Sequence, residues 1–146
     1  MPTHAEKRIV PYSAEQMFDL VADMEKYPEF LPWCHGVRIR RWEKDDTCIV
    51  DMAVGFKMFR EKFTTRDVLI RPQRIEVQFH SGPFRHLRNT WSFDQTEDGR
   101  CLLDFYIDFA FRSSFFERMV SMLFHDAVRV MVSAFERRAA VVYGKP

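Results

Sequence analysis

The chain has 146 residues, which is the size of a single domain with one core that buries about 70% of the unfolded surface. Its 22 basic and 21 acidic residues give a net charge of +1, so no overall field favours nucleic acid or a strongly anionic surface. We therefore expect one domain over residues 1–146 and no DNA partner, and any polyanionic partner would need a local patch of cations.

The N-terminus carries no apolar run of signal-peptide length, and nowhere do eighteen uncharged apolar residues follow one another. These features predict a cytoplasmic protein without a membrane span. The three cysteines, Cys34, Cys48 and Cys101, are widely spaced and form no C-x-x-C pair. We expect buried free thiols, with neither a disulfide framework nor a zinc site.

A short strand is predicted to end at Ile9-Val10, and a short amphipathic helix follows it. Ser13 is suited to be the N-cap of this helix, and Gln16 completes a capping box. Apolar residues recur at helical spacing from position 14 to position 21, and Asp23 ends the pattern.

The segment from Met24 to Cys34 fits neither the helical nor the strand period. Pro28 and Pro32 fix their own φ angles and bias the preceding residues toward extended conformations, so a long helix is excluded here. Two interpretations stay open: a loop that caps the core, or a lid over an apolar cavity. The large apolar side chains of this segment are Tyr27, Phe30, Leu31 and Trp33.

From His35 onward the apolar period changes to two, which predicts strands. Turn-forming dipeptides separate consecutive runs, as in an antiparallel meander. The predicted strands are Val37–Trp42, Thr47–Phe56, Met58–Ile70, Arg74–Ser81, His86–Asp94 and Arg100–Phe111.

A long helix is predicted from Phe115 to Tyr143, about 44 Å in length. Ser114 and Glu117 would form its capping box, and Gly144 suits its C-terminal end. The expected fold is α+β: a curved seven-stranded antiparallel sheet that grips the long helix, with short helical structure after the first strand. Spacing predicts an apolar helix face of Phe116, Val120, Leu123, Ala127, Val130, Met131, Ala134 and Val142.

The inward face of such a sheet would be almost wholly apolar, with Glu61 and Asn89 among its few polar exceptions. A buried carboxylate needs a partner, and Arg138 falls on the apolar face of the helix. Glu61 is therefore expected either to pair with Arg138 or to orient a ligand together with Asn89. The predicted ligand cavity consists of Met52, Val54, Phe59, Glu61, Phe63, Val77, Phe79, Asn89, Trp91, Phe93, Phe105, Phe109, Leu123, Ala127 and Met131.

Catalytic patterns are poor. No histidine falls clearly on the inward face, no serine or cysteine stands in a nucleophile motif, and glycine-rich phosphate loops and metal-ligand spacings are absent from the sequence. We predict no catalytic residues, no metal and no required cofactor. The alternative is a cyclase in which an inward acid acts as a base on an enolisable substrate.

Three stretches together give a resemblance that runs over nearly the whole chain: residues 27–34, residues 82–93 with Gly82-Pro83-Phe84, and residues 135–144 with Phe135-Glu136-Arg137-Arg138-Ala139. The chain resembles the coenzyme Q-binding START-domain family, a branch of the polyketide cyclase and lipid-transfer helix-grip proteins. The resemblance implies a role in ubiquinone function in respiration. Bacterial members of that family include a ribosome association toxin.

The leading hypothesis is a noncatalytic carrier of an isoprenoid quinone such as ubiquinone, held between sheet and helix and delivered at a membrane surface. Phe115 and Met122, near Arg112 and Arg118, are candidates for membrane contact; alternatively, they pack beneath the Gly82-Pro83-Phe84 loop. The predicted entrance consists of Tyr27, Phe30, Leu31, Trp33, Phe84, Phe115 and Met122.

The rival hypothesis is a regulator that binds the large ribosomal subunit and blocks subunit association. The proposed phosphate-contacting residues are Arg38, Arg40, Arg41, Arg85 and Arg88. Solvated strand faces would equally explain these arginines.

Overall fold

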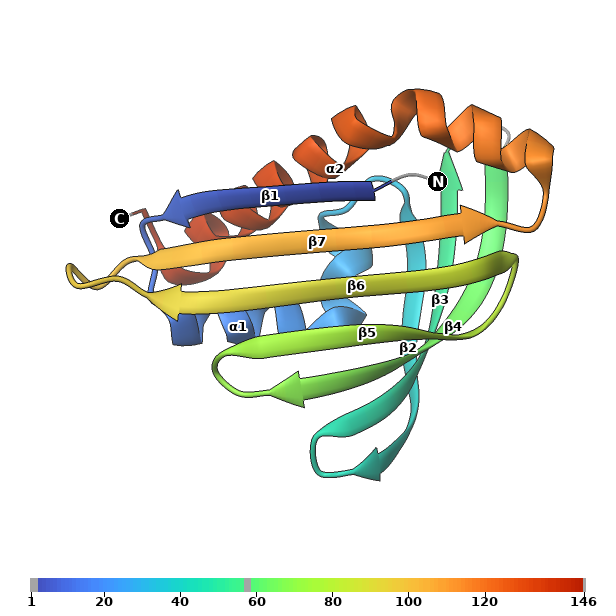
Figure 1. The fold of residues 1–146 in the computed structure, drawn as a ribbon. Helices are drawn as coiled ribbons and strands as arrows, with labels where there is room; N and C mark the ends of the chain where they lie inside the picture. Colours follow the sequence, from blue (N-terminus) through green and yellow to red (C-terminus); the bar gives the residue numbers. More distant parts are fainter. Residues whose placement is uncertain (1–2, 57–58, 146) are drawn as a thin grey trace.

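The computed structural model describes residues 3–56 and 59–145, and the side chains of Phe56, Phe59 and Leu123 lie outside this description. Within the described residues, seven antiparallel strands form one curved sheet in the order β1-β7-β6-β5-β4-β3-β2. The helix-grip α+β fold is thus confirmed (Figure 1). The strands are β1 Thr3–Val10, β2 Cys34–Lys44, β3 Thr47–Phe56, β4 Phe59–Ile70, β5 Arg74–Ser81, β6 Phe84–Gln95 and β7 Cys101–Phe111.

The first connection contains the α1 helix, Ala14–Ala22, and the 3-10 helix η1, Met24–Glu29. The predicted capping box of α1 is present: the Ser13 hydroxyl accepts from the Gln16 amide at 3.1 Å, and the Gln16 side chain accepts from the Ser13 amide at 3.0 Å. The Glu25 carboxylate of η1 accepts from the Ile39 amide at 3.2 Å. Because Ile39 is on the edge strand β2, η1 covers backbone donors that would otherwise remain free.

The long helix α2 spans Ser114–Tyr143 and ends at Gly144, where φ is +85°. Its N-cap is Ser113, so the predicted capping box on Ser114 is wrong. The Ser113 hydroxyl accepts from the Phe116 amide at 3.4 Å, and Glu117 accepts from the Phe111 amide at 2.6 Å. The Glu117 carboxylate therefore ties the helix start to the end of β7 instead of to its own N-cap.

The buried face of α2 is rotated from the predicted one by about one residue. Val130 and Val142 are exposed, contrary to prediction. In this orientation Arg8 on β1 donates to Ser133 and pairs with Glu136, both at 3.3 Å. The fully buried residues of α2 are Phe124, Val128, Val132, Ala134, Phe135 and Ala139.

Phe135 lies where α2, the sheet and the first connection meet. Its ring packs edge-on against Trp91 of β6 at 5.1 Å, against Tyr27 of η1 at 5.3 Å, and against Phe30 at 5.1 Å between centroids. Edge-to-face aromatic pairs add to the free energy that area burial already supplies. This aromatic cluster holds α2 against both the sheet and η1.

We predict that Phe135→Ala lowers the free energy of unfolding by about 3 to 5 kcal/mol, since truncating a buried phenylalanine loses its contacts and leaves a cavity. The matched control is Val142→Ala on the exposed side of the same helix, with an expected change within about 0.5 kcal/mol. Urea denaturation of both variants measures this. Equal effects would show that Phe135 does not hold the helix.

Candidate functional site

The inner face of the sheet divides into two halves. Trp91, Phe93, Phe105 and Phe109, on β6 and β7, are buried. Helix α2 packs against β1, β7 and α1 and runs along that side of the sheet (Figure 1). On β3, β4 and β5, five apolar side chains of the inner face remain partly exposed: Met52, Val54, Phe63, Val77 and Phe79.

We use the name inner groove for these side chains together with Val120 and Met131 of α2, all of which pack, partly buried, against the core. Cross-strand register supports the grouping, because Met52 is opposite Phe63 and Val54 is opposite Glu61. Ala127 lies one turn before Met131 on α2 and is exposed, contrary to its predicted place on the apolar face of the helix. Phe59 and Leu123 were also predicted to line the cavity, but their side chains lie outside the described residues.

The predicted ion pair between Glu61 and Arg138 is wrong. Arg138 pairs with Glu29 of η1 at 2.8 Å and lies over the Phe30 ring, 5.2 Å from its centroid. The hydrogen bond from Arg138 lowers the pKa of the Glu29 carboxyl. Arg138 therefore attaches η1 to α2, and Glu61 stays half-buried at the groove without that partner.

Asn89 lies on the inner face as predicted, in register with Val77 on one side and Ile107 on the other. Its amide nitrogen donates to the Tyr106 carbonyl at 2.8 Å, which orients the side chain. Beside it the β5–β6 pairing ends at Gln78 and Arg88. A recess of about 240 Å³ opens at this break, lined by Glu76, Val77, Gln78, Leu87, Arg88, Asn89 and Thr90.

Asp67 is a buried inner-face carboxyl that was not among the predicted site residues. It is 3% exposed and accepts a hydrogen bond from the Thr65 hydroxyl at 2.7 Å. Burial raises the pKa of Asp67 to about 6. The sequence alternation along β4 predicts that Asp67 lies on the inward face together with Glu61, and the structure confirms this position.

Tyr27 of η1 lies close to Asp67. Burial raises the pKa of Tyr27 well above its usual value, and the Asp67 charge raises it further. The Tyr27 hydroxyl donates to the Val21 carbonyl at the end of α1. Asp67 thus lies at the covered end of the inner face, near η1.

The residues predicted to form one entrance lie in two places. Tyr27 and Phe30 pack against Phe135 in the second half of α2, and Leu31 is buried with them. The Trp33 carbonyl accepts from the Gly55 amide at 2.8 Å, near the end of β3. Residues 27–31 therefore pack as a cover over the core and do not meet the first turn of α2.

The second group of predicted entrance residues consists of Phe84 and two residues at the start of α2. Phe84 is buried among the rings of Phe63, Phe79, Phe109 and Phe111. Phe115 and Met122 are 69% and 85% exposed. The alternative in which both pack beneath the Gly82-Pro83-Phe84 loop is therefore wrong, because the loop is packed on the sheet and these side chains point to solvent.

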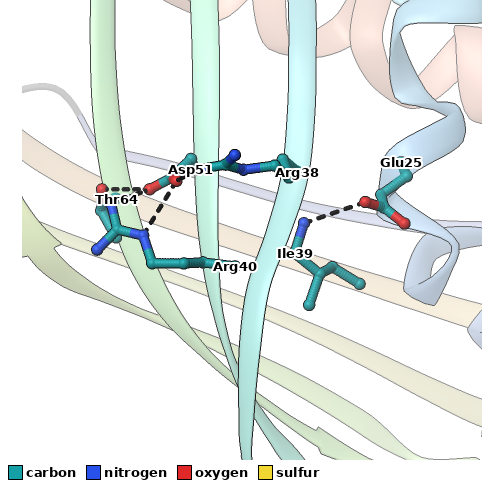
Figure 2. Close-up of polar contacts among 6 residues, drawn as sticks. All are labelled: Glu25, Arg38, Ile39, Arg40, Asp51 and Thr64. Carbon is teal, nitrogen blue, oxygen red and sulfur yellow. Dashed lines mark hydrogen bonds and ion pairs between the residues drawn. The ribbon is translucent and has the colours of Figure 1, made fainter.

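The arginines of β2 are not free cations. Figure 2 shows Arg40 and Thr64 converging on Asp51, and Arg40 and Asp51 are 2.7 Å apart. Arg38 also pairs with Asp51, at 3.3 Å. The Thr64 and arginine hydrogen bonds lower the pKa of Asp51.

Arg41 completes the trio on β2 and lies 3.8 Å from Glu43. Arg85 and Arg88 are on β6, and β5, β4 and β3 separate that strand from β2. The five arginines predicted to contact phosphate therefore do not form one patch.

A polar network that sequence reasoning missed joins β1 to α2. His4 lies on the inner face, in register with Ile107, whereas the sequence placed no histidine there. The Nδ1 atoms of His4 and His125 are 2.9 Å apart, and Nε2 of His4 is 3.2 Å from Glu6. Glu6 in turn pairs with Arg8 at 2.8 Å. The alternation of exposed and partly buried residues from Thr3 to Val10 was the sequence signal that could have placed His4 on the inner face.

The three cysteines are buried and free, as predicted. Burial raises the pKa of Cys34 to about 11, of Cys48 to about 12 and of Cys101 to about 11. Such thiols are poor nucleophiles at neutral pH. Among the described residues, no three His, Cys, Asp or Glu side chains gather as metal ligands would. Over the same residues, no helix is both long and apolar enough to cross a membrane.

Comparison with known proteins places this geometry in a family. The family model described as "Polyketide cyclase / dehydrase and lipid transport" matches residues 10–136. The "Ribosome association toxin RatA" of Escherichia coli strain K12 is 37% identical over 144 residues, which cover 98% of this chain and 90% of that protein.

A second relative is the mitochondrial "Coenzyme Q-binding protein COQ10 homolog B" of Xenopus laevis, 32% identical over 146 residues, with 97% of this chain and 59% of that protein covered. Among solved structures, the Zhui aromatase/cyclase of Streptomyces sp. R1128 superposes with a TM-score of 0.83 over 94% of this chain and 93% of that chain. It is 17% identical, so this likeness shows the fold alone.

We predict that Asp67 makes stability fall with rising pH. Its folded-state pKa of about 6 lies above the unfolded value, so the folded protein binds this proton more tightly than the unfolded chain does. As the pH rises from 4 to 6 the proton is lost, and the free energy of unfolding falls by up to about 3 kcal/mol. Asp67→Asn should remove this loss and be more stable than the parent at pH 7.5, but not at pH 4.

Urea denaturation at several pH values measures this difference. Asp45→Asn, in the exposed turn between β2 and β3, is the control and should follow the parent at every pH. If the free energy of unfolding depends on pH in the same way for Asp67→Asn and the parent, the raised pKa of Asp67 is wrong.

Proposed function

The chain belongs to the polyketide cyclase / dehydrase and lipid transport family, and we propose that its inner groove binds and carries an isoprenoid quinone such as ubiquinone without catalysing a reaction on it. The observation that carries the proposal is the partial exposure of apolar side chains on the inner face of β3, β4 and β5. Concave apolar surfaces with few polar groups are typical of small-molecule sites.

Binding would be dominated by the tail. Each methylene transferred from water contributes about 0.8 kcal/mol, so the roughly ten carbons of two isoprene units offset a sizeable ordering cost. Phe63, Val77 and Phe79 offer the flat and branched surfaces that such a tail packs against. The remainder of a long tail would extend out of the groove beside the exposed Ala127.

The headgroup needs only a few polar contacts. Glu61 lies at the groove free of the predicted arginine pair, and Asn89 is held in place by its bond to Tyr106. The Glu61 carboxylate can accept a hydrogen bond from a quinol hydroxyl, and the second N–H of the Asn89 amide can donate to a quinone oxygen. The relative named as coenzyme Q-binding supports this ligand class.

Cyclase chemistry is the weaker alternative. It would require Glu61 to act as the base, and no positioned second acid or nucleophile is found beside it among the described residues. The solved aromatase/cyclase shares the fold, but its sequence identity is too low to support a shared reaction.

The second candidate function is association with the large ribosomal subunit, for which the relatives named as ribosome association toxins are the supporting observation. Arg85 and Arg88 are the exposed arginines of the predicted set that form no ion pair with a residue the structure describes. They are the best placed of that set to contact phosphate, because the β2 arginines are already paired with Asp51 and Glu43.

We predict that Met131→Asp abolishes binding of a short-tail ubiquinone, because it places a charge inside the apolar groove. Val130→Asp is the matched control, since the adjacent residue is 47% exposed on the other side of α2. At a ligand concentration of about 100 Kd the parent should gain about 2.7 kcal/mol of stability.

Thermal denaturation with and without ligand measures this gain. The Val130→Asp variant should keep the ligand-induced shift, and Met131→Asp should show none. If the parent itself gains no stability and organic extracts of purified protein contain no lipid, the carrier proposal fails.

For the second candidate, we expect the Arg85→Glu, Arg88→Glu double variant to weaken co-sedimentation with large subunits and to reduce its salt dependence. The control is Arg38→Glu, which changes a cation already paired with Asp51. Co-sedimentation that both changes leave intact would exclude the β6 arginines as the contact.

A further inference from the structure

The first two turns of α2 are apolar on both sides. Phe116, Met119 and Val120 pack toward the core. Phe115 and Met122, on the other side, are 69% and 85% exposed. The outer side of this segment therefore exposes two large apolar side chains beside the charged Arg118, a combination suited to the interface between water and a bilayer.

The exposed residues form one stripe. Phe115 and Met122 are seven residues apart, which is about 20° short of two full turns. Arg118 lies three residues after Phe115 and four before Met122, so it occupies the same stripe. Phe115, Arg118 and Met122 therefore project together from the start of α2.

Two further arginines adjoin this stripe. Phe84 is paired with Phe111 across the β6–β7 ladder, which brings Arg85 and Arg112 to the same end of the sheet. The Arg112 guanidinium donates to the Phe84 carbonyl at 3.1 Å. Arg85 and Arg118 make no ion pair with any residue that the structure describes.

The acidic groups nearby do not cancel these charges. Glu117, the acid of the first turn, accepts from the Phe111 amide at 2.6 Å and is directed toward the end of β7. Asp126, further along the helix, is 4.0 Å from Arg129. The stripe thus combines exposed apolar side chains with an excess of cations.

We propose that Phe115, Arg118 and Met122, flanked by Arg85 and Arg112, form a docking surface for an anionic phospholipid bilayer. The apolar side chains would enter the boundary between headgroups and acyl chains, and the arginines would contact lipid phosphates. The complementarity of charge favours an anionic over a neutral bilayer. We call this set the helix-start surface.

The helix-start surface adjoins the inner groove through a chain of aromatic contacts. Phe116 packs against Phe111, which stacks on Phe84 at 4.7 Å, and Phe84 contacts the groove residues Phe63 and Phe79. The inference rests on the proposed lipid-carrying function, because docking here would bring the groove next to the source or acceptor of its ligand.

The test is flotation of the full chain with vesicles of phosphatidylcholine alone and of phosphatidylcholine mixed with phosphatidylglycerol. The parent should bind the anionic vesicles preferentially. The Phe115→Ser, Met122→Ser double variant should lose at least about tenfold in partitioning, and Arg118→Glu should lose the preference for anionic lipid. Because all three side chains are solvent-exposed, we expect each variant to retain the parental thermal stability.

The control is Val141→Ser, which removes an apolar side chain that is 76% exposed at the opposite end of α2. It should bind vesicles like the parent. The proposal is overturned if the parent does not float with anionic vesicles, or if Val141→Ser loses as much binding as the double variant. It is also overturned if the double variant loses ribosome co-sedimentation while its flotation is unchanged.

Failure of the carrier function is distinguishable. The stability gain from short-tail ubiquinone is measured without vesicles, where the double serine variant should match the parent. If flotation depends on the helix-start surface while no variant gains stability from the quinone, the docking surface stands and the proposed ligand is wrong.

Discussion

The arrangement of this protein depends on where the Phe135 ring packs. That ring contacts Trp91 on the sheet and both Tyr27 and Phe30 in the first connection. Aromatic contacts of this kind are directional as well as apolar, so they determine which side of the sheet the long helix covers. With α2 held beside β1, β7 and η1, the inner faces of β3, β4 and β5 are left partly open.

Polar contacts reinforce the same placement. Arg8 links β1 to Ser133 and Glu136, and Arg138 links α2 to Glu29 of η1. Each pair is at the margin of the helix, where partial exposure keeps the cost of desolvation low. Because the arginines serve to position α2, they leave Glu61 available at the groove. The fold thereby separates the groups that hold the helix from those that can meet a ligand.

The distribution of exposed side chains separates two kinds of partner. On the β2 strand, cations are matched by Asp51 and Glu43, as expected for a solvated strand face. At the start of α2, exposed Phe115 and Met122 stand beside Arg118, which makes no ion pair with any residue that the structure describes. The family includes relatives named as coenzyme Q-binding and as ribosome association toxins. The proposed function of the inner groove and that of the helix-start surface can be tested separately.

Local patterns in the sequence determined the elements. The alternation along β7, the capping box at Ser13 and the glycine after Tyr143 each act within a few residues, so β7, the start of α1 and the end of α2 followed from them. The pairing of Arg138 with Glu29 and the rotation of α2 were decided only by tertiary structure. These features join residues far apart in the chain, and helical periodicity cannot specify which partner a side chain meets across the core.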